Sequence, residues 1–312
     1  MKTLLLGANG QVGRTFLEGG SLAKLGPLIS ATRHGGDAAA THSIEAVDLA
    51  STDSILALLD RVQPDVVINA AAYTAVDKAE HEEALAMQVN GHAVGVLGAW
   101  AATHKALVVH YSTDYVFDGK RTEPYPVDAA TAPLGVYGRS KLMGEEALRA
   151  SGADHMIFRT AWVYSAHGHN FLRTMLRLGK ERDELRVVAD QHGAPTPADL
   201  IVRATIAALG HWQQTAPSDR PSLQGTHHLV SSGATTWFGF ATDIFDQAIA
   251  RGLITHRPRL AAIQTIDFPT PAMRPEYSVL DNSGFQKLFG VALPDWREGL
   301  DNVMKTLSTL GS

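Results

Sequence analysis

The feature that most constrains the fold is a glycine-rich segment close to the N-terminus. Gly7, Gly10 and Gly13 directly follow the apolar residues 4–6. A strand that ends in a tight turn needs a residue without Cβ at that turn, and the second glycine lets a pyrophosphate approach the backbone. The third glycine lets the next helix pack against the strand, and the N-terminus of that helix favours an anion. The spacing predicts a strand, turn and helix that bind a dinucleotide, and a plain structural turn is the alternative.

A tyrosine and a lysine form the second informative pattern. Tyr137 and Lys141 are four residues apart in a segment that we expect to be helical, so their side chains share one helical face. A nearby ammonium favours the tyrosinate and lowers the pKa of a tyrosine from about 10. The pair can donate a proton to an oxygen that becomes an alkoxide as hydride arrives, while Thr113 polarises the carbonyl and Lys141 holds the nicotinamide ribose. A chance register on an amphipathic helix is the alternative for this pair alone. Together with the glycine motif, the pair predicts a nicotinamide-dependent oxidoreductase.

Short apolar segments alternate with longer amphipathic segments through the first half of the chain. Apolar strands between helices are typical of a parallel sheet that is covered on both faces. We therefore expect an α/β fold: a doubly wound, Rossmann-like parallel sheet with a smaller C-terminal substrate domain. The expected strands cover residues 2–6, 28–32, 44–49, 65–69, 106–111 and 155–160, and the expected helices cover 52–62, 83–104 and 134–150.

Prolines divide the second half of the chain into shorter segments, which is typical of a less regular domain. We expect residues 1–165 to form the NADP-binding domain, with about 195–232 returning to it. Residues 166–194 and 233–312 should then mainly bind the substrate. The expected helices of this half cover 170–179, 198–209, 236–250 and 296–307, and residues 213–224 are expected to form an exposed loop.

Composition and charge argue against several function classes. The formal net charge is -5 and no run of Lys or Arg occurs, which argues against nucleic-acid partners and a basic membrane-binding surface. The chain has no Cys, so disulfides and thiolate chemistry are excluded. The apolar stretch before Gly7 is too short for a signal peptide, and no stretch approaches a membrane span, so we expect a cytoplasmic protein. The histidines lack zinc-ligand spacing, so we expect no such metal site.

The end of the second strand bears on the choice of cofactor. Enzymes that use NAD place an Asp or Glu there to bind the ribose hydroxyls. Residues 30–34 contain no acid, and Arg33, next to Thr32, can meet a 2′-phosphate. Asp48 ends the next short strand and can reach the adenine region. We therefore expect NADPH as the preferred cofactor, with NADH use left open. A solvated loop arginine is the alternative interpretation of Arg33.

Seven stretches of the chain carry a family resemblance, and together they are far more specific than any single motif. At these residues the chain resembles the extended short-chain dehydrogenase/reductase family over nearly its whole length. The stretches cover residues 7–13, 69–80, 110–119, 133–141, 159–164, 190–196 and 271–275.

The resemblance implies an activity and a set of site residues. It implies NADPH-dependent reduction of the C4 ketone of dTDP-4-dehydro-L-rhamnose, a nucleotide sugar, by hydride transfer. A reductase or epimerase of another nucleotide sugar and a non-catalytic NADP-binding regulatory subunit are the alternatives. The implied residues are Thr113, Tyr137 and Lys141 for catalysis, Gln11, Val12, Asp48, Leu49, Ala71, Ala72 and Tyr111 for the cofactor, and Thr74, Val76, Thr113, Asp114, Tyr137, Trp162 and Arg274 for the substrate.

Two of the implied substrate contacts have a physical motive of their own. Trp162 offers an aromatic wall to the apolar C–H faces of a pyranose ring. Arg274, between Met273 and Pro275, can pair with the diphosphate that a nucleotide sugar carries. The alternative for Arg274 is an ion pair with an acid such as Glu276 or Asp281.

The chain departs from the family pattern at several positions. Tyr73 stands where family members often have His, and Thr32 where many have an acid. Some members have a Glu just after the third glycine that helps to hold a magnesium ion between subunits, whereas this chain has Arg14. Asp199 and Asp295 are the candidates for the other two metal-site acids, but the set is incomplete. We therefore do not expect a magnesium-bridged dimer, and a monomer and a homodimer both stay open.

Overall fold

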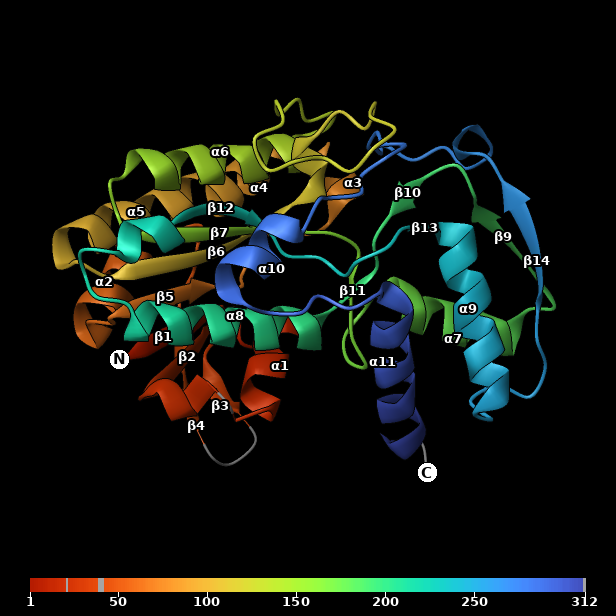
Figure 1. The fold of residues 1–312 in the computed structure, drawn as a ribbon, viewed down its shortest axis with the longest axis horizontal. Helices are drawn as coiled ribbons and strands as arrows, with labels where there is room; N and C mark the ends of the chain where they lie inside the picture. The colour runs from red at the N-terminus through yellow and green to blue at the C-terminus, as the bar shows by residue number, and fades with distance from the viewer. Residues whose placement is uncertain (21, 39–41, 311–312) are drawn as a thin grey trace.

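A large, mostly parallel sheet forms the centre of the fold in the computed structural model, which describes residues 1–20, 22–38 and 42–310. Within these residues the main sheet has eight strands in the order β12-β7-β6-β5-β1-β2-β4-β3, and all neighbours are parallel except β3 and β4. The predicted doubly wound, Rossmann-like sheet is confirmed (Figure 1). The strands are β1 (Thr3–Leu6), β2 (Leu28–Thr32), β3 (Gly36–Ala38), β4 (His42–Ala46), β5 (Val66–Asn69), β6 (Leu107–Thr113), β7 (His155–Thr160) and β12 (Gly225–His228).

Successive side chains of β1 explain why the sheet needs helices on both faces. Leu5 points into a core shared with α1, α8 and α10, whereas Leu4 and Leu6 point into the opposite core, shared with α2, α5 and α6. Neighbouring residues of a strand face opposite sides, so an all-apolar strand must be covered twice. Figure 1 shows α5 and α6 on one side of the sheet and α1 and α8 on the other. The elements are α1 (Gln11–Glu18), α2 (Thr52–Val62), α3 (Val76–Ala79), α4 (Glu83–Met87), α5 (Ala93–His104), α6 (Val136–Ala150), α8 (Ala198–Gln214) and α10 (Ser283–Phe289), with the π turn η2 (Gln88–His92) and the 3-10 turns η1 (Leu22–Leu25), η3 (Asp114–Val116) and η4 (Arg220–Leu223).

A second core lies beside the sheet, on the right in Figure 1. It is built on α7, α9 and α11 with the parallel strand pair β9 and β14, and it buries Phe240, Phe245 and Trp296. Among the described residues, no helix is both long and apolar enough to cross a membrane. The elements are α7 (Phe171–Glu181), α9 (Trp237–Ala250), α11 (Trp296–Leu310), β9 (Glu184–Val188), β14 (Arg259–Ile263), η5 (Thr265–Asp267) and the short pairs β8 (Val163–Tyr164) with β11 (Thr196–Pro197) and β10 (His192–Gly193) with β13 (Thr235–Thr236).

The chain returns to the main sheet after α7. The strand β12 pairs with β7 and forms one edge of the sheet. Ile201 and Leu209 of α8 and Leu229 after β12 are buried in the same core as Leu5. The segment with α8 and β12 therefore packs with the N-terminal half of the chain, although it follows α7 in the sequence.

The strand expected at residues 44–49 is shifted toward the N-terminus. It is β4, His42–Ala46. The N–H of Val47 still pairs with β2, but the Asp48 carboxylate accepts the N–H of Ala50 and begins a turn. Asp48 therefore follows the strand instead of ending it, since aspartate competes with a strand by bonding the backbone two residues on.

Two predicted elements near the site also differ in extent. The helix expected at 83–104 is interrupted by the π turn Gln88–His92, which the sequence pattern does not reveal. The strand expected at 106–111 continues to Thr113 because its ladder with β7 continues to that residue. Thr113 thus ends a strand and does not follow it.

The second half of the chain contains the larger errors. The helix expected at 198–209 continues to Gln214, so the loop expected at 213–224 begins inside a helix and also holds η4. The strands β9, β12 and β14 and the helix α10 were not expected. β12 reads Gly-Thr-His-His and charged residues interrupt β9, so neither shows the apolar run of a buried parallel strand. β14 has a short apolar run after Arg259, but two of its residues are small alanines.

Replacing Gly13 by alanine tests the close approach of α1 to the end of β1. A Cβ at Gly13 would lie 2.1 Å from the carbonyl oxygen of Gly7, a backbone atom that cannot rotate away. We expect Gly13→Ala to lower the free energy of unfolding by about 1–3 kcal/mol or more, the usual cost of overpacking. Gly210→Ala in α8 is the matched control, because nothing lies within 4 Å of its added Cβ. It should stabilise the protein by roughly 0.5–1 kcal/mol. Urea denaturation measures both, and equal effects would contradict the prediction.

Candidate active site

A groove of about 580 Å³ opens along the carboxyl ends of β1, β5 and β6. Nearly all the residues predicted for the cofactor line it, because parallel strands end at one edge of a sheet. Gly13 is the exception and packs beneath the turn, against Gly7. The predicted residues that line the groove are Gly7, Gly10, Gln11, Val12, Thr32, Arg33, Asp48, Leu49, Ala71, Ala72, Thr74, Tyr111, Tyr137 and Lys141.

The N-terminus of α1 faces this groove without a side-chain cap. Its N-cap residue is Gly10, which has no side chain to accept the first N–H groups of the helix. Gly7 has a φ of 81°, and a Cβ there would lie 2.6 Å from the backbone nitrogen of Ala71. Free N–H groups and the helix dipole favour an anion at such a point. The turn therefore has the shape and the charge that a pyrophosphate needs.

Arg33 and Asp48 face each other on the rim of the groove. Arg33 Nη2 and Asp48 Oδ2 are 3.8 Å apart, and the side chains are 65% and 45% exposed. An ion pair of this kind contributes little, so the guanidinium stays free to bind another anion. Thr32 is buried at the end of β2 and adds no negative charge. A 2′-phosphate at this point would meet one cation, Arg33, beside the carboxylate of Asp48.

Tyr137 and Thr113 meet at the end of β6. The hydroxyl of Thr113 lies within hydrogen-bonding reach of the Tyr137 phenol, and the Tyr115 ring packs edge-on against it with centroids 5.6 Å apart. Loss of solvation raises the pKa of Tyr137 above its ordinary value. The prediction that this pKa is lowered is therefore wrong, because burial penalises the tyrosinate and the Lys141 ammonium is bonded to the Tyr111 carbonyl instead. The phenol keeps its proton, which is the form that can donate one.

Lys141 lies one helical turn after Tyr137 and is 2% exposed. Its Nζ donates to the carbonyl oxygen of Tyr111 at 2.5 Å and lies 3.4 Å from Nε2 of His110. Burial lowers the pKa of Lys141 to about 8, although the carboxylate of Glu145 opposes the shift. Lys141 is therefore mostly charged at neutral pH and can donate hydrogen bonds at the groove that it lines.

A buried ion pair holds α6 in place behind these residues. Arg159 on β7 donates to the two carboxylate oxygens of Glu145 at 2.9 and 2.7 Å. The two side chains are 4% and 0% exposed, and Arg149 donates to the same carboxylate at 3.1 Å. A bidentate arginine–carboxylate pair has a fixed geometry, so it orients α6 against the sheet.

The sequence prediction missed Asn90, which lies in the π turn η2. Its Oδ1 accepts the N–H of Tyr73 at 2.8 Å, and its Nδ2 donates to the Tyr73 carbonyl at 2.9 Å and to Ser140 Oγ at 3.0 Å. These bonds tie the segment after β5 to α6. π turns are frequent at functional sites, and a buried Asn within an Ala- and Val-rich helix was the only signal available. The Tyr73 phenol, at the position where family members often have His, donates to Glu82 at 2.7 Å.

The residues predicted for the substrate do not all reach the groove. Thr74 and Tyr137 line it, and Val76, Thr113, Asp114, Trp162 and Arg274 lie outside its lining. The groove is also lined by residues outside the predicted binding set: Asn9, Val47, Ala50, Ala70, Tyr73, Leu85, Val89, Ser112, Thr160, Val163, Gly168 and His169.

Arg274 bridges two segments that are far apart in the sequence. Its Nη2 lies 2.8 Å from Asp77 Oδ2, and its Nη1 donates to the Tyr115 phenol at 3.0 Å. The alternative for Arg274, an ion pair with an acid, is therefore present, but the acid is Asp77 and not Glu276 or Asp281. Asp77 precedes Arg274 by 197 residues, so nothing local in the sequence marks the pair. The segment that carries Arg274 is thereby tied to α3.

Trp162 is held in an uncommon backbone conformation. Its φ is 48°, in the left-handed region that bulky residues rarely adopt. Its ring stacks on Trp237 with centroids 3.5 Å apart and planes at 5°. A Cβ at Gly193 would lie 2.4 Å from the Trp162 ring, so glycine leaves the room for it. Trp237 was not predicted as a site residue; its Nε1 donates to Gln191 at 3.2 Å.

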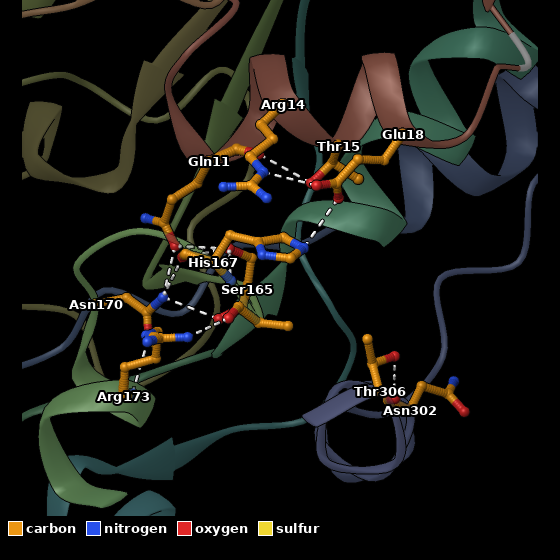
Figure 2. Close-up of polar contacts among 11 residues, drawn as sticks. Gln11, Arg14, Thr15, Glu18, Ser165, His167, Asn170, Arg173, Asn302 and Thr306 are labelled. Carbon is orange, nitrogen blue, oxygen red and sulfur yellow. Dashed lines mark hydrogen bonds and ion pairs between the residues drawn. The ribbon is translucent and has the colours of Figure 1, made fainter. Parts of the chain in front are cut away.

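Gln11 connects the glycine turn to the second core, as Figure 2 shows. Its Oε1 accepts from Asn170 Nδ2 at 2.8 Å and from Ser165 Oγ at 3.1 Å. Asn170 also caps the N-terminus of α7. In the same view, His167 Nε2 lies 3.0 Å from Glu18 Oε2, at the end of α1. The first and last turns of α1 are therefore both bonded to the segment that leads into α7.

The acids that resemble the magnesium ligands of some family members are paired with arginines. Arg203 donates to Asp199 at 2.8 Å. Arg14, which stands where some members have the third acid, donates to Glu18 at 2.6 Å. Asp295 lies 3.6 Å from the arginine two positions later. Within the described residues, no three His, Asp or Glu side chains come together in a group that could hold a metal ion.

Asp114 is the most strongly buried carboxyl group beside Tyr137. It is 1% exposed. Its Oδ1 accepts a hydrogen bond from the Thr113 hydroxyl at 3.0 Å, whereas its Oδ2 has no hydrogen-bond partner. Burial raises the pKa of Asp114 from 3.8 to about 6. The charged form is therefore destabilised near neutral pH.

This carboxyl group gives a prediction for stability. The folded state holds the Asp114 proton more tightly than the unfolded chain, so stability should fall as the pH rises from 3.8 to about 6. Asp114→Asn removes the buried charge and should raise the free energy of unfolding at pH 7.5 by roughly 1–3 kcal/mol. The exposed Asp128→Asn is the control and should change little. Urea unfolding between pH 4 and pH 7.5 measures this dependence. If Asp114→Asn had the same pH dependence as the parent, the dependence would not come from Asp114.

Comparisons with known proteins agree with this fold. Residues 1–309 match the family model described as the RmlD substrate binding domain. The chain is 45% identical over 302 residues to a dTDP-4-dehydrorhamnose reductase of Burkholderia thailandensis, which covers 95% of this chain and 96% of the relative.

Two solved structures are similar over almost the whole chain. A dTDP-4-dehydrorhamnose reductase from Clostridium acetobutylicum is 34% identical with a TM-score of 0.85, and one from Bacillus anthracis in complex with NADP is 32% identical with a TM-score of 0.82. Each comparison covers 98% of this chain and 99% of the other. The chain therefore belongs to the dTDP-4-dehydrorhamnose reductase family of extended short-chain dehydrogenases/reductases and is an NAD(P)-dependent oxidoreductase.

Proposed function

We propose that this protein reduces the C4 ketone of dTDP-4-dehydro-L-rhamnose to dTDP-L-rhamnose, with NADPH as hydride donor and Tyr137 as proton donor. The observation that carries the proposal is that Tyr137 and Lys141 line the same groove as the uncapped N-terminus of α1, and burial favours the protonated form of the Tyr137 phenol. The names of the curated relatives support the substrate, and the solved relative bound to NADP supports the cofactor.

NADPH would lie along the groove and would supply a hydride to the carbonyl carbon of the substrate. The uncapped N-terminus of α1, which begins after Gly10, would hold its pyrophosphate. Arg33 would bind the 2′-phosphate and Lys141 the nicotinamide ribose, since both line the groove. Ala71 and Ala72 leave room at the end of β5 because their side chains are small.

Tyr137 would deliver the proton that balances the hydride. The substrate oxygen gains negative charge and takes the proton from the Tyr137 phenol, and the Lys141 ammonium stabilises the tyrosinate that forms. The Thr113 hydroxyl donates to Asp114 Oδ1 at 3.0 Å. Thr113 would therefore have to release Asp114 before it could donate to the substrate oxygen.

Trp162 and Arg274 would recognise the sugar and the diphosphate. Trp162 would offer a ring face to the sugar, and its stack on Trp237 places it against the second core. Arg274 would exchange the Asp77 carboxylate for a phosphate, one anion for another. Residues 166–194 and 233–312 would thus mainly serve the substrate, and residues 1–165, with about 195–232, the cofactor.

The substrate assignment is tested by NADPH oxidation with purified 4-keto nucleotide sugars. We expect turnover with dTDP-4-dehydro-L-rhamnose. Turnover of another 4-keto nucleotide sugar but not this one would move the enzyme to a different substrate. NADPH binding without turnover of any such compound would instead indicate a non-catalytic NADP-binding subunit.

The proton-transfer roles give a second prediction. Removing a positioned general acid costs about 10²–10⁴ in rate, so Tyr137→Phe should lose turnover in that range while it still binds NADPH. Lys141→Met should weaken both, because one ammonium serves the phenol and the ribose. Tyr277→Phe, a partly buried tyrosine outside the groove lining, is the matched control and should keep the parent rate. Parent-level turnover by Tyr137→Phe would show that another group donates the proton.

Cofactor preference gives a third prediction. A hydrogen bond to a charged group contributes roughly 1.5–3 kcal/mol, so Arg33→Ala should lower kcat/KM for NADPH about tenfold or more and leave NADH nearly unchanged. Arg61→Ala is the control, since Arg61 is similarly exposed and pairs with Glu45 away from the groove lining. If Arg33→Ala lowered kcat/KM equally for NADPH and NADH, Arg33 would not bind the 2′-phosphate.

A further inference from the structure

Two buried polar residues lie directly behind Lys141. His110 on β6 is 0% exposed and Asn69 on β5 is 1% exposed, and the two are cross-strand partners in the sheet. His110 Nε2 lies 3.4 Å from Lys141 Nζ, and His110 Nδ1 lies 3.1 Å from Asn69 Nδ2. Neither residue lines the groove. Any effect of this pair on the reaction must therefore pass through Lys141.

Lys141, His110 and Asn69 form a row of hydrogen-bonding groups, and the donors in this row must all point the same way. An ammonium group only donates, so a charged Lys141 needs Nε2 of His110 as the acceptor. The imidazole proton then sits on Nδ1, and Asn69 must accept it with Oδ1. In the structure Asn69 turns Nδ2 toward His110, and its Oδ1 is buried without a hydrogen-bond partner. Turning the carboxamide by 180° exchanges the two atoms and gives the imidazole Nδ1–H an acceptor, Asn69 Oδ1.

The row therefore has two self-consistent arrangements. In one, the donors run from Asn69 through His110 toward a neutral Lys141. In the other, the carboxamide is turned and the donors run from a charged Lys141 through His110 to Asn69. The orientation of the row and the charge on Lys141 are coupled, because a mixed arrangement sets two donors or two acceptors against each other.

Few groups around Lys141 favour its charged form, so its contact with His110 matters for that charge. Burial lowers the pKa of Lys141 to about 8, and from α6 only Glu145 is placed to oppose it, with neutral Tyr137 one turn away. From β6, the Tyr111 carbonyl accepts one hydrogen bond. Burial and the nearby Lys141 hold the pKa of His110 well below its ordinary value. His110 is therefore neutral at physiological pH and able to accept from the ammonium.

We propose that His110, oriented by Asn69, is a positioning residue that accepts a hydrogen bond from the Lys141 ammonium and keeps this group charged and aimed at the groove. The inference rests on the proposed function, in which Lys141 serves the ribose and the phenol. His110 touches neither the cofactor nor the substrate in this role, so it acts only through Lys141.

Two substitutions separate this role from simple packing. A Gln side chain reaches about as far as Nε2 of a histidine, so His110→Gln keeps an acceptor for Lys141. An Asn side chain reaches only about as far as Nδ1, so His110→Asn keeps the contact with Asn69 but leaves Lys141 without this acceptor. Both variants are polar, uncharged and smaller than histidine, so a packing role predicts similar effects for both.

The measurement is the pH dependence of NADPH binding, followed by fluorescence, and of kcat/KM for the 4-keto substrate. Both should decline at high pH as Lys141 loses its proton. Removing a contact that favours the charged form lowers the pKa of Lys141, so His110→Asn should move the midpoint about one to two pH units lower. His110→Gln should keep the parent midpoint. An unmoved midpoint in His110→Asn, or the same shift in both variants, would overturn the proposal.

A second measurement does not depend on folded variants. Nitrogen-15 NMR of the parent protein with NADPH reports which imidazole nitrogen carries the proton, and the His110 signal is assigned by its absence in His110→Gln or by its coupling to neighbouring protons. We expect the proton on Nδ1, and a proton on Nε2 would contradict the proposal. NADPH binding and NMR need no substrate, so a failed substrate assignment leaves this test readable. Parent-level turnover by Tyr137→Phe would refute the proton donor and not the contact between His110 and Lys141.

Discussion

Loss of solvation at the end of β6 is the constraint on which the chemistry of this protein depends. The same burial raises the pKa of Tyr137 and of Asp114 and lowers the pKa of Lys141, because it penalises the charged form of each group. The phenol is thereby kept as a proton donor, and the ammonium is brought close to the pH at which it titrates. Opposed shifts of this kind are typical of sites that transfer protons. The surrounding contacts, above all the buried pair of Glu145 and Arg159, hold α6 and these groups against the sheet.

The site also needs the two cores to meet in one arrangement. Gln11, in the first turn of α1, accepts hydrogen bonds from the segment that leads into α7. Trp162 lies between the cores and stacks on Trp237 of α9. Arg274 ties the C-terminal segment to α3 through its ion pair with Asp77. The turn that contains the glycines is therefore bonded through Gln11 to the segment that leads into the second core.

The sequence by itself determined the features that depend on local sterics and on the period of each element. The spacing of the glycines predicted the turn, because a Cβ at Gly13 would collide with the backbone of Gly7, only six residues earlier. The shared face of Tyr137 and Lys141 follows from the helical repeat. Apolar strands between helices predicted the parallel sheet, and the cofactor residues gather at one edge because parallel strands end together. The family resemblance, confirmed by the comparisons, supplied further groove residues, among them Asp48, Ala71 and Tyr111.

Only the tertiary structure decided how the groups of the site affect one another. The pKa of Tyr137 moved opposite to the prediction, because burial penalises the tyrosinate and the Lys141 ammonium is bonded to the Tyr111 carbonyl. The partner of Arg274 is 197 residues away, and the His110–Asn69 row exists only because β5 and β6 pair in this register. The polar strand β12 joins the sheet through its pairing with β7 and not through its own pattern. The burial of a group and the identity of its bonding partner depend on segments that are distant in the sequence. The sterics of a turn and the period of a helix depend on a few consecutive residues.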